Sequence, residues 1–213
     1  MKLNNEYRFE VKKKRPEEIY EKVTEYFKGK TLLNYARSKS LMRIQEKITI
    51  RSLELLDLKK KEGLILDAGC GPGFTSIYLK EIGYNVVALD LISEFLSFYN
   101  IRELNPLAAD ISFMPFQPNI FDAIISISAL QWIYRELKNE TMEYKLINLA
   151  TCINNILKSN SKAIFQFYPK NNLIMEAIGK IFTKHTDLIG DFVIDNPDNA
   201  KKRRIFLVLK KRE

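Results

Sequence analysis

The stretch Leu64-Ile65-Leu66-Asp67-Ala68-Gly69-Cys70-Gly71-Pro72-Gly73-Phe74 decides the fold of this 213-residue chain. A short apolar run ends in an acid, and three glycines then follow at alternate positions, which is typical of a buried strand that enters a tight turn and a helix. Glycine lets the backbone turn sharply and approach a ligand, and the first amides of the helix face the same point. The stretch therefore predicts a strand, a turn and a helix that together bind a small ligand.

Two common nucleotide-binding turns do not fit this stretch. A dinucleotide fingerprint, G-x-G-x-x-G, would need glycine where Phe74 stands, because the last glycine comes one residue early at Gly73. A phosphate-binding P-loop would need a lysine followed by serine or threonine, and none follows. The turn thus disfavours a nicotinamide cofactor and excludes a P-loop, and the remaining alternative to a ligand site is a tight turn without a ligand.

Strand-like and helix-like segments alternate after this stretch. Short apolar runs predict buried strands, and segments with helical spacing lie between them. Such alternation predicts an α/β fold, a mostly parallel seven-stranded sheet with helices on both faces, in which the last two strands form an antiparallel pair. The predicted strands cover residues 64–66, 86–89, 106–109, 123–127, 163–167, 187–194 and 204–209, and the predicted helices cover 74–81, 93–100 and 139–157.

The first sixty residues predict a helical extension. Pro16 and the two acids after it suit a first helical turn, and apolar residues recur at helical spacing over residues 19–27. After Gly29 a longer helix, broken once, is expected to run to Leu56. We therefore expect residues 1–60 to form an N-terminal helical extension of the single domain whose sheet is built from residues 61–213.

Composition narrows the class of protein. Apolar residues make up 46% and charged residues 28% of the chain, and no apolar run reaches the ~18 residues of a membrane span. The charged start of the chain lacks a secretory signal, so we expect a cytoplasmic protein. Two cysteines and one histidine offer no zinc set, and we expect no metal site. The net charge of +8 suggests a polyanionic partner, although a basic surface can also serve solubility alone.

Acids stand at the ends of the first three predicted strands. Asp67 ends the first, Asp90 ends the second and Asp110 follows the third. Because parallel strands end at one edge of the sheet, these carboxyl groups are expected to lie near one another, and Asp90 is placed to accept both hydroxyls of a ribose. Either later acid alone could instead be a helix cap or a surface charge.

The segment 67–73 resembles motif I of class I S-adenosylmethionine-dependent methyltransferases, D-x-G-x-G-x-G. That resemblance implies a Rossmann-like class I methyltransferase fold with S-adenosyl-L-methionine as the cofactor. It also implies that the turn holds the methionine part, that Asp90 holds the ribose, and that Asp110 and the next backbone amide hold the adenine. The cofactor-binding residues expected on this basis are Asp67, Gly69, Cys70, Gly71, Gly73, Asp90, Leu91, Asp110, Ile111 and Ser126.

The end of the fourth predicted strand, Ser126-Ile127-Ser128-Ala129-Leu130-Gln131-Trp132, predicts the acceptor side. It contains no Asn-Pro-Pro-Tyr or Asp-Pro-Pro-Tyr turn of the kind that grips an amine, and neither Cys70 nor Cys152 is placed for attack on a pyrimidine. Guanine N7 needs no general base, because its lone pair carries no proton. Ser126, Ser128 and Gln131 could donate or accept hydrogen bonds and Trp132 could stack, so these four are the expected catalytic residues; core packing and helix capping are the alternatives.

Longer strings carry a closer resemblance. Residues 126–132, Phe165-Gln166-Phe167-Tyr168-Pro169 and Asp195-Asn196-Pro197 resemble the small-subunit (18S-type) ribosomal RNA guanine-N7 methyltransferases, as do scattered residues between Tyr35 and Leu56. The chain looks like a short, archaeal-like form, with Ser40 where the family usually carries arginine. The resemblance implies a role in ribosome biogenesis, with ribosomal RNA or a pre-ribosome as substrate. The expected RNA-binding residues are Tyr35, Arg37, Lys39, Arg43, Tyr168, Lys201 and Lys202.

The same resemblance implies a heterodimer with a small zinc-binding activator protein that adds a strand to the sheet edge. The zinc would belong to that partner, and no membrane is involved. Two other functions stay open on the sequence alone. One is methylation of transfer RNA, a protein or a small molecule, because the cofactor half would look the same. The other is an assembly factor that acts mainly by binding to pre-ribosomes.

Overall fold

A computed structural model describes residues 14–58, 63–98 and 104–213 of the chain. Its strands are β1 (Leu64–Ala68), β2 (Asn85–Asp90), β3 (Asn105–Ala108), β4 (Phe121–Ile127), β5 (Leu157–Phe167), β6 (Leu188–Asp195) and β7 (Arg204–Lys211). They form one seven-stranded sheet in the order β3-β2-β1-β4-β5-β7-β6. Neighbouring strands are parallel except that β7 is antiparallel to both β5 and β6. The predicted α/β sheet and its antiparallel final pair are confirmed.

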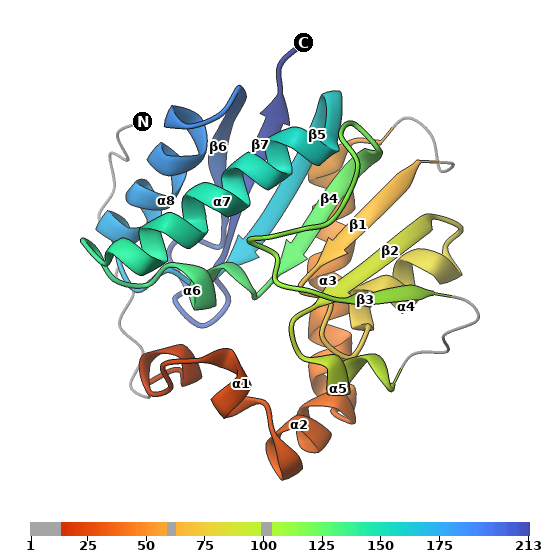
Figure 1. Cartoon of the computed structure of the whole chain (residues 1–213). Helices are drawn as coiled ribbons and strands as arrows, with labels where there is room; N and C mark the ends of the chain where they lie inside the picture. Colours follow the sequence, from red (N-terminus) through yellow and green to blue (C-terminus); the bar gives the residue numbers. More distant parts are fainter. Residues whose placement is uncertain (1–13, 59–62, 99–103) are drawn as a thin grey trace.

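Helices cover both faces of this sheet (Figure 1). Two pack on one face and two on the other, and the short helices lie near the carboxyl ends of the strands. The helical elements are η1 (Pro16–Glu18), α1 (Val23–Tyr26), α2 (Gly29–Ala36), α3 (Lys39–Leu56), α4 (Phe74–Glu81), α5 (Ser93–Leu96), α6 (Leu130–Ile133), α7 (Glu140–Ile156) and α8 (Asn172–Lys184). Within the described residues no helix is long and apolar enough to cross a membrane.

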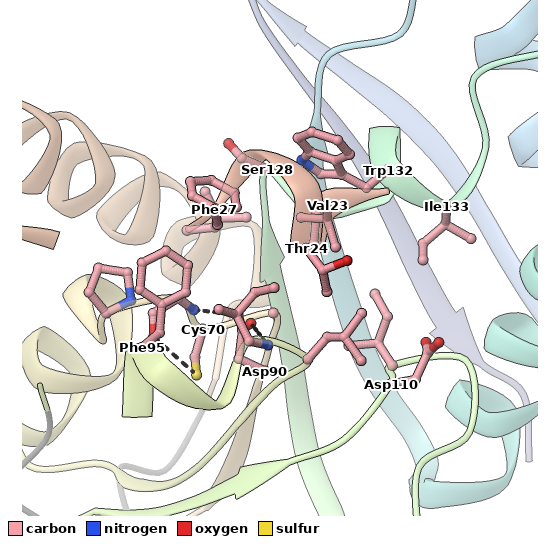
Figure 2. Close-up of a pocket in the computed structure, with 18 of the residues that line it drawn as sticks. Val23, Thr24, Phe27, Cys70, Asp90, Phe95, Asp110, Ser128, Trp132 and Ile133 are labelled. Atoms are coloured by element: carbon pink, nitrogen blue, oxygen red, sulfur yellow. Dashed lines mark hydrogen bonds between the residues drawn. The ribbon is translucent and has the colours of Figure 1, made fainter. Parts of the chain in front are cut away.

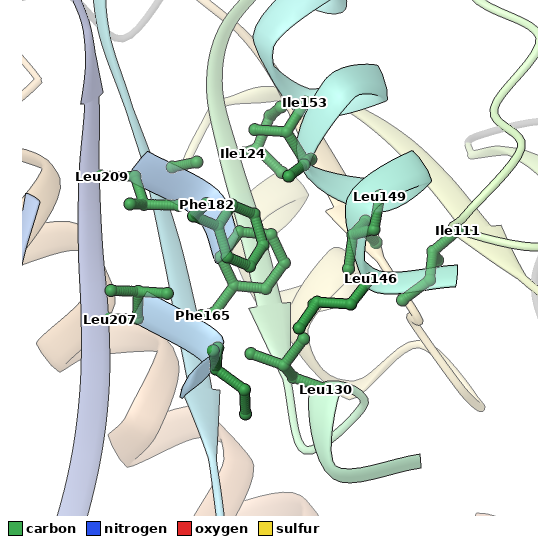
Figure 3. Close-up of a cluster of buried hydrophobic side chains, with 14 of the residues drawn as sticks. Ile111, Ile124, Leu130, Leu146, Leu149, Ile153, Phe165, Phe182, Leu207 and Leu209 are labelled. Atoms are coloured by element: carbon green, nitrogen blue, oxygen red, sulfur yellow. The ribbon is translucent and has the colours of Figure 1, made fainter. Parts of the chain in front are cut away.

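Alternate residues of each strand supply the two cores, because successive side chains of a strand point to opposite faces. Ile65 and Ile125 pack against α3 and α4, whereas Leu66 and Ile124 pack against α7 and α8. Figure 3 shows the second of these cores, where Phe165 of β5 meets Phe182 of α8 with ring centroids 5.3 Å apart. Apolar burial on both faces explains why the central strands are nearly continuous apolar runs.

Side-chain caps fix where the longer helices begin. Ser38 Oγ accepts a hydrogen bond from the Leu41 amide at the start of α3, and Asn139 Oδ1 accepts from the Met142 amide at the start of α7. Such caps satisfy amides that have no partner inside the helix and stabilise it by ~1 kcal/mol. The break between α2 and α3 falls at residues 37–38, so the expected single break after Gly29 is confirmed.

Several predicted boundaries are wrong. Helical spacing predicts one helix over 19–27, but only Val23–Tyr26 is helical, because Ile19 and Tyr20 are exposed and only Val23 and Phe27 pack against a buried cluster. Helix 93–100 ends at Leu96, and residues 99–100 lie outside the described part of the chain. Strand β5 begins at Leu157 rather than at 163. Helix α8 was not predicted, although its buried residues at 174, 175, 178, 181 and 182 have helical spacing.

The N-terminal segment continues past the sheet rather than along it. In Figure 1, α1 and α2 lie beyond the carboxyl ends of the strands, on the side where α5 and α6 also lie. Helix α3 then returns along one face of the sheet and packs through Ile48 and Leu56. The carboxyl ends of the strands therefore face a covering segment, and open parallel sheets bind their ligands at this edge.

Candidate functional site

A cavity of about 260 Å³ lies between the carboxyl ends of the strands and the N-terminal segment (Figure 2). Its walls combine the glycine turn, the ends of β2 and β4, the loop after β3 and the aromatic residues of the N-terminal segment. Among its lining residues are Thr24, Phe27, Tyr35, Gly69, Cys70, Gly71, Asp90, Leu91, Phe95, Asp110, Ile111, Ser128, Ala129, Trp132 and Ile133.

The glycine turn after β1 approaches the loop after β4 so closely that only glycine fits. Gly69 has a φ of 81°, and a Cβ atom on it would lie 2.7 Å from the Cβ atom of Ala129. The amides of Gly69 and Cys70 both donate to the Leu89 carbonyl, at 2.7 and 3.0 Å. Gly73, with a φ of 90°, caps α4. The turn is therefore tied to β2 on one side and packed against the β4 loop on the other.

Asp90 connects two segments at the cavity wall. Its Oδ2 accepts from the Gly71 amide at 2.7 Å, and its Oδ1 accepts from the Ile92 amide at 2.8 Å. Burial raises the pKa of Asp90, and these backbone hydrogen bonds oppose the rise. Each carboxylate oxygen has two lone pairs, so both can still accept from a ligand hydroxyl.

Asp67 lies behind the glycine turn and does not line the cavity. It is 1% exposed, and its Oδ2 accepts from the Ser76 hydroxyl of α4 at 2.5 Å. Burial raises the pKa of Asp67 to about 7; the Ser76 hydrogen bond lowers it, and the nearby charge of Asp90 raises it further. Asp67 therefore ties α4 to β1 beneath the turn.

Asp110 lines the far end of the cavity, after β3. Its Oδ1 accepts from the Ser112 amide at 2.8 Å, and the next residue, Ile111, is a buried wall residue. Leu91 also lines the cavity, beside Asp90. The structure thus gathers Gly69, Cys70, Gly71, Asp90, Leu91, Asp110 and Ile111 around one cavity, while Asp67, Gly73 and Ser126 are absent from its wall.

The loop after β4 is held by β5. Ser128 has a positive φ of 59°; its amide donates to the Gln166 carbonyl at 2.8 Å and its hydroxyl to Gln166 Oε1 at 3.1 Å. Gln131 Nε2 donates to the Ser128 carbonyl at 2.9 Å. Ser126 is buried, and its hydroxyl has no hydrogen-bond partner within the described chain. Of the four expected catalytic residues, Ser128 and Trp132 line the cavity and Ser126 and Gln131 do not.

Trp132 belongs to an aromatic cluster that closes the cavity. Its ring stacks on Tyr26 with centroids 6.0 Å apart and lies 6.3 Å from the ring of Phe27. Phe27 in turn contacts Tyr35 at 5.0 Å and Phe95 at 5.1 Å. Figure 2 shows Phe27, Trp132 and Phe95 around the same opening. The sequence does not predict that Phe27 and Phe95 meet at this cavity, because they are far apart in the chain and Phe27 reaches the cavity through the path of the N-terminal segment.

Tyr35 is the one expected RNA-binding residue in the cavity wall. Its hydroxyl accepts from Gln45 Nε2 at 3.1 Å, and burial raises its pKa to about 12.

The other expected RNA-binding residues lie outside the first cavity. Tyr168 lines a second cavity together with Gln131. Lys201 and Lys202 line a third cavity, next to the ion pair between Arg51 and Asp195. Arg37, Lys39 and Arg43 are exposed and outside the first cavity. Within the described residues, no cluster of His, Cys, Asp or Glu could hold a metal ion.

Comparisons with known proteins identify relatives of this chain. The methyltransferase domain family matches residues 66–165. The 18S rRNA (guanine-N7)-methyltransferase of Bos taurus is 32% identical over 189 residues, which cover 86% of this chain and 67% of that protein. The Saccharomyces cerevisiae enzyme of the same kind is 33% identical over 180 residues, 82% of this chain and 65% of that protein. This chain therefore spans about two thirds of the length of these relatives.

A solved structure shares the fold. The N-methyltransferase NodS of Bradyrhizobium japonicum, crystallised with S-adenosyl-L-homocysteine, has a TM-score of 0.63 at 14% identity, over 86% of this chain and 97% of that one. The predicted class I methyltransferase fold is thereby confirmed, and the predicted family is confirmed by the bovine and yeast relatives. On its sequence similarity to these relatives, the chain belongs to the 18S rRNA (guanine-N7)-methyltransferase family.

Proposed function

We propose that this chain transfers a methyl group from S-adenosyl-L-methionine to guanine N7 in small-subunit ribosomal RNA during ribosome biogenesis. The observation that carries the cofactor half is one cavity whose wall holds the glycine turn, Asp90 and Asp110. The acceptor half rests on the family to which the chain belongs. The name of those relatives states their substrate, and we extend it to this chain.

The cavity suits an adenosine-containing ligand. Asp90 would accept from the two ribose hydroxyls, while its bonds to the Gly71 and Ile92 amides hold it in place. Asp110 would accept from the adenine amine, with the Ile111 backbone amide donating to the ring. The turn of Gly69, Cys70 and Gly71 would approach the methionine part, and Leu91 would contact the sugar. Asp67, Gly73 and Ser126 would act indirectly, by holding the turn and the end of β4.

The proposed reaction needs no general acid or general base from the protein. When bound, the cofactor supplies an electrophilic methyl group on a sulfonium, and the bond to sulfur breaks as the bond to N7 forms. N7 has no proton to lose, and the wall residues in the loop after β4 and in α6, Ser128, Ala129, Trp132 and Ile133, are all neutral. We propose that these residues orient the two reactants and exclude water, which is catalysis by positioning.

The RNA would be held mainly through its phosphates. The chain has a net charge of +8, and Lys201 and Lys202 stand together with Lys47 and Arg204 around the third cavity. Each phosphate contact from a lysine or arginine releases counterions and strengthens binding. We propose that this cluster, together with exposed Arg37, Lys39 and Arg43, contacts the ribosomal RNA or pre-ribosome.

A second partner, a small zinc-binding activator protein, would pair with the edge of the sheet. β3 is one of the two edge strands, paired in the described chain with β2, and the exposed aromatic side chains of Phe113 and Tyr144, which follow it in the chain, lie in contact with ring centroids 6.3 Å apart. An unpaired edge beside apolar surface suits strand addition. Co-expression of this chain with the activator protein should yield a heterodimer, and Phe113→Asp should dissociate it. A monomer of this chain that is active without the activator would exclude an obligate heterodimer. The cytoplasmic location stays a prediction.

The deciding experiment maps modified nucleosides. Small-subunit RNA from cells with and without this gene, digested and analysed by mass spectrometry, should differ by 7-methylguanosine at one position. Asp90→Ala should abolish that difference and weaken cofactor binding about tenfold or more, because it removes a charge-assisted hydrogen bond. A modification that differs at another base, or in transfer RNA, would show that the chain methylates that acceptor instead. Unchanged RNA modification together with normal binding to pre-ribosomes would favour an assembly factor.

A further inference from the structure

A second cavity of about 380 Å³ adjoins the first, and the proposed binding of cofactor and phosphates gives it no role. Glu21 lines both cavities, and α6 contributes a residue to each, since Gln131 lines the second and Trp132 the first. The remaining walls come from the N-terminal segment around η1 and from the loop between β5 and α8. They include Arg15, Glu17, Tyr20, Arg135, Tyr168 and Pro169.

Glu17 is the unusual residue of this cavity. It is only 6% exposed, yet no hydrogen bond from another side chain to its carboxylate and no ion pair with it occur among the described residues. Arg15 and Arg135 act on it only through their charge, its own backbone amide is its hydrogen-bond donor, and burial raises its pKa. A buried carboxylate is normally paired or hydrogen-bonded, because desolvation is costly. Glu17 therefore has capacity to accept hydrogen bonds from a molecule in the cavity.

Gln131 lines the same wall, and its amide is held by α6 and the loop before it. It is 6% exposed; its Nε2 donates to Ser128, but its Oε1 has no partner within the described residues. The ring of Tyr168 provides an aromatic surface, held from one side by the Arg15 guanidinium 5.3 Å from its centroid and by the Arg15 bond to the Tyr168 carbonyl at 2.8 Å. The cavity thus offers the Glu17 carboxylate as an acceptor and Tyr168 as an aromatic wall, the elements that recognise an unstacked base.

We propose that this second cavity binds the guanine that receives the methyl group, with the Glu17 carboxylate accepting from guanine N1–H and N2–H. The inference rests on the proposed function and names the part of the site that selects the base. Guanine alone among the four RNA bases presents two adjacent donors on its Watson–Crick edge, which match two carboxylate oxygens. Adenine and cytosine place a ring acceptor there, which a carboxylate repels, and uracil offers a single donor between two acceptors.

This orientation also suits the chemistry. A carboxylate on the Watson–Crick edge leaves N7, on the opposite side of the purine, free to face the first cavity. An arginine bound to O6 and N7 would instead cover the reacting atom. As the purine gains positive charge, N1–H and N2–H become stronger donors, so the Glu17 contact is tighter in the transition state than in the ground state. Glu17 would therefore increase the rate as well as select the base.

The test measures binding of guanosine 5′-monophosphate and inosine 5′-monophosphate to the protein saturated with S-adenosyl-L-homocysteine. Inosine lacks the 2-amino group, so wild-type protein should bind it about tenfold more weakly, the value of one charge-assisted hydrogen bond. Glu17→Gln should bind both nucleotides equally weakly. Glu136→Gln removes the same charge from an exposed residue of the same cavity and should keep the preference. Unchanged affinity for S-adenosyl-L-homocysteine shows that each variant is folded.

Three outcomes decide the inference. The inference is supported if Glu17→Gln loses the preference for the guanosine nucleotide and Glu136→Gln keeps it. It is also supported if 7-methylguanosine 5′-monophosphate binds more tightly than guanosine 5′-monophosphate to wild-type protein but not to Glu17→Gln. Equal binding of the two nucleotides by wild-type protein overturns it, even if ribosomal RNA still gains 7-methylguanosine. If the preference for guanosine depends on Glu17 but small-subunit RNA is not methylated, the second cavity binds guanine and the proposed function on ribosomal RNA is wrong.

Discussion

Gly69 shows how one residue determines whether the site can form. It combines a left-handed backbone with a close approach to Ala129 at the point where the turn after β1 meets the loop after β4. A side chain at position 69 would strain the left-handed backbone and would also collide with Ala129 in the neighbouring loop. Both the turn after β1 and the loop after β4 would shift as a result.

Gly69→Ala should therefore cost more than a change at an ordinary positive-φ glycine. A left-handed alanine costs ~1–2 kcal/mol, and overpacking against Ala129 adds ~1–3 kcal/mol. Gly83→Ala is the matched control, since Gly83 has a φ of 97° but nothing within 4 Å of an added Cβ. Urea unfolding should show the larger loss for Gly69→Ala, and calorimetry should show weaker cofactor binding only there. Equal losses would mean that the contact with Ala129 relaxes freely.

Asp67 should make the stability of the protein depend on pH. Its pKa of about 7 in the folded chain lies above the ordinary value of 3.8, so the folded state holds this proton more tightly than the unfolded state. The free energy of unfolding should then fall as the pH rises from about 4 to about 7, by at most ~1.4 kcal/mol per pH unit. Asp67→Asn, which can still accept from Ser76, should flatten this slope in urea titrations at pH 5 and pH 8. Asp198→Asn, at an exposed position, is the control, and an identical slope in wild type and Asp67→Asn would contradict the prediction.

The sequence predicts some site residues better than others, for a physical reason. The glycines, Asp90 and Asp110 are local to strand ends, and strand ends share one edge of a parallel sheet, so their meeting follows from spacing alone. Glu17 and Phe27 reach the site only through the path of the N-terminal segment, which depends on tertiary contacts. The same holds for the separation of Gln131 from Trp132, because neighbouring residues of one short helix line different cavities.

At the level of elements, the N-terminal segment is a cover held by side chains rather than by regular structure. Its short helices α1 and α2 bury little by themselves. The rings of Phe27 and Tyr35 pack against Phe95, and Phe27 also packs against Trp132. Arg15 fastens its start by donating to the carbonyls of Tyr168 and Pro169. Apolar spacing over 19–27 predicts a longer helix wrongly because Ile19 and Tyr20 are exposed, so the apolar residues of this segment form no single buried face.

Phe27→Ala should loosen this cover without unfolding the sheet. Trp132 is the only tryptophan of the chain, so its emission reports on the cluster. We expect a red-shifted emission, a loss of ~1–3 kcal/mol in unfolding free energy and faster release of the cofactor in stopped-flow measurements. Ile77→Ala, at an exposed position on α4, should change none of these. An unchanged emission in Phe27→Ala would show that Trp132 is held by other contacts.

The architecture of the whole molecule is what the sequence predicts most completely. Apolar runs of strand length alternate with helical segments, and the right-handed connections of parallel sheets leave few arrangements for such a chain. The exact ends of β5 and α5 are not predicted because they depend on neighbours rather than on local composition. The boundary between the N-terminal helical extension and the sheet domain at residues 60 and 61 stays a prediction. Helix α3 of the extension packs on the sheet.

The charge of the whole molecule gives a prediction for RNA binding. Affinity should fall linearly on a plot of log binding constant against log salt concentration, because each phosphate contact releases counterions. The double variant Lys201→Ala, Lys202→Ala should reduce the slope by about 0.7 to 0.9 for each phosphate that it no longer neutralises. Lys180→Ala with Lys184→Ala removes the same charge from α8 as a control. If the control reduces the slope equally, net charge and not the cluster at the third cavity determines binding.

The two backbone bonds of Asp90 have a consequence for the descent of such proteins. A lineage that abandoned catalysis would still need this carboxylate, since it links the turn after β1 to the segment after β2. Asp90 would therefore outlast the activity, and its presence in a distant homologue is poor evidence that the homologue is an enzyme. Glu17 joins no two segments in this way among the described residues. If it reads guanine as proposed, it should be among the first residues to drift once methylation disappears, and pseudoenzymes of this family should be recognisable by its replacement.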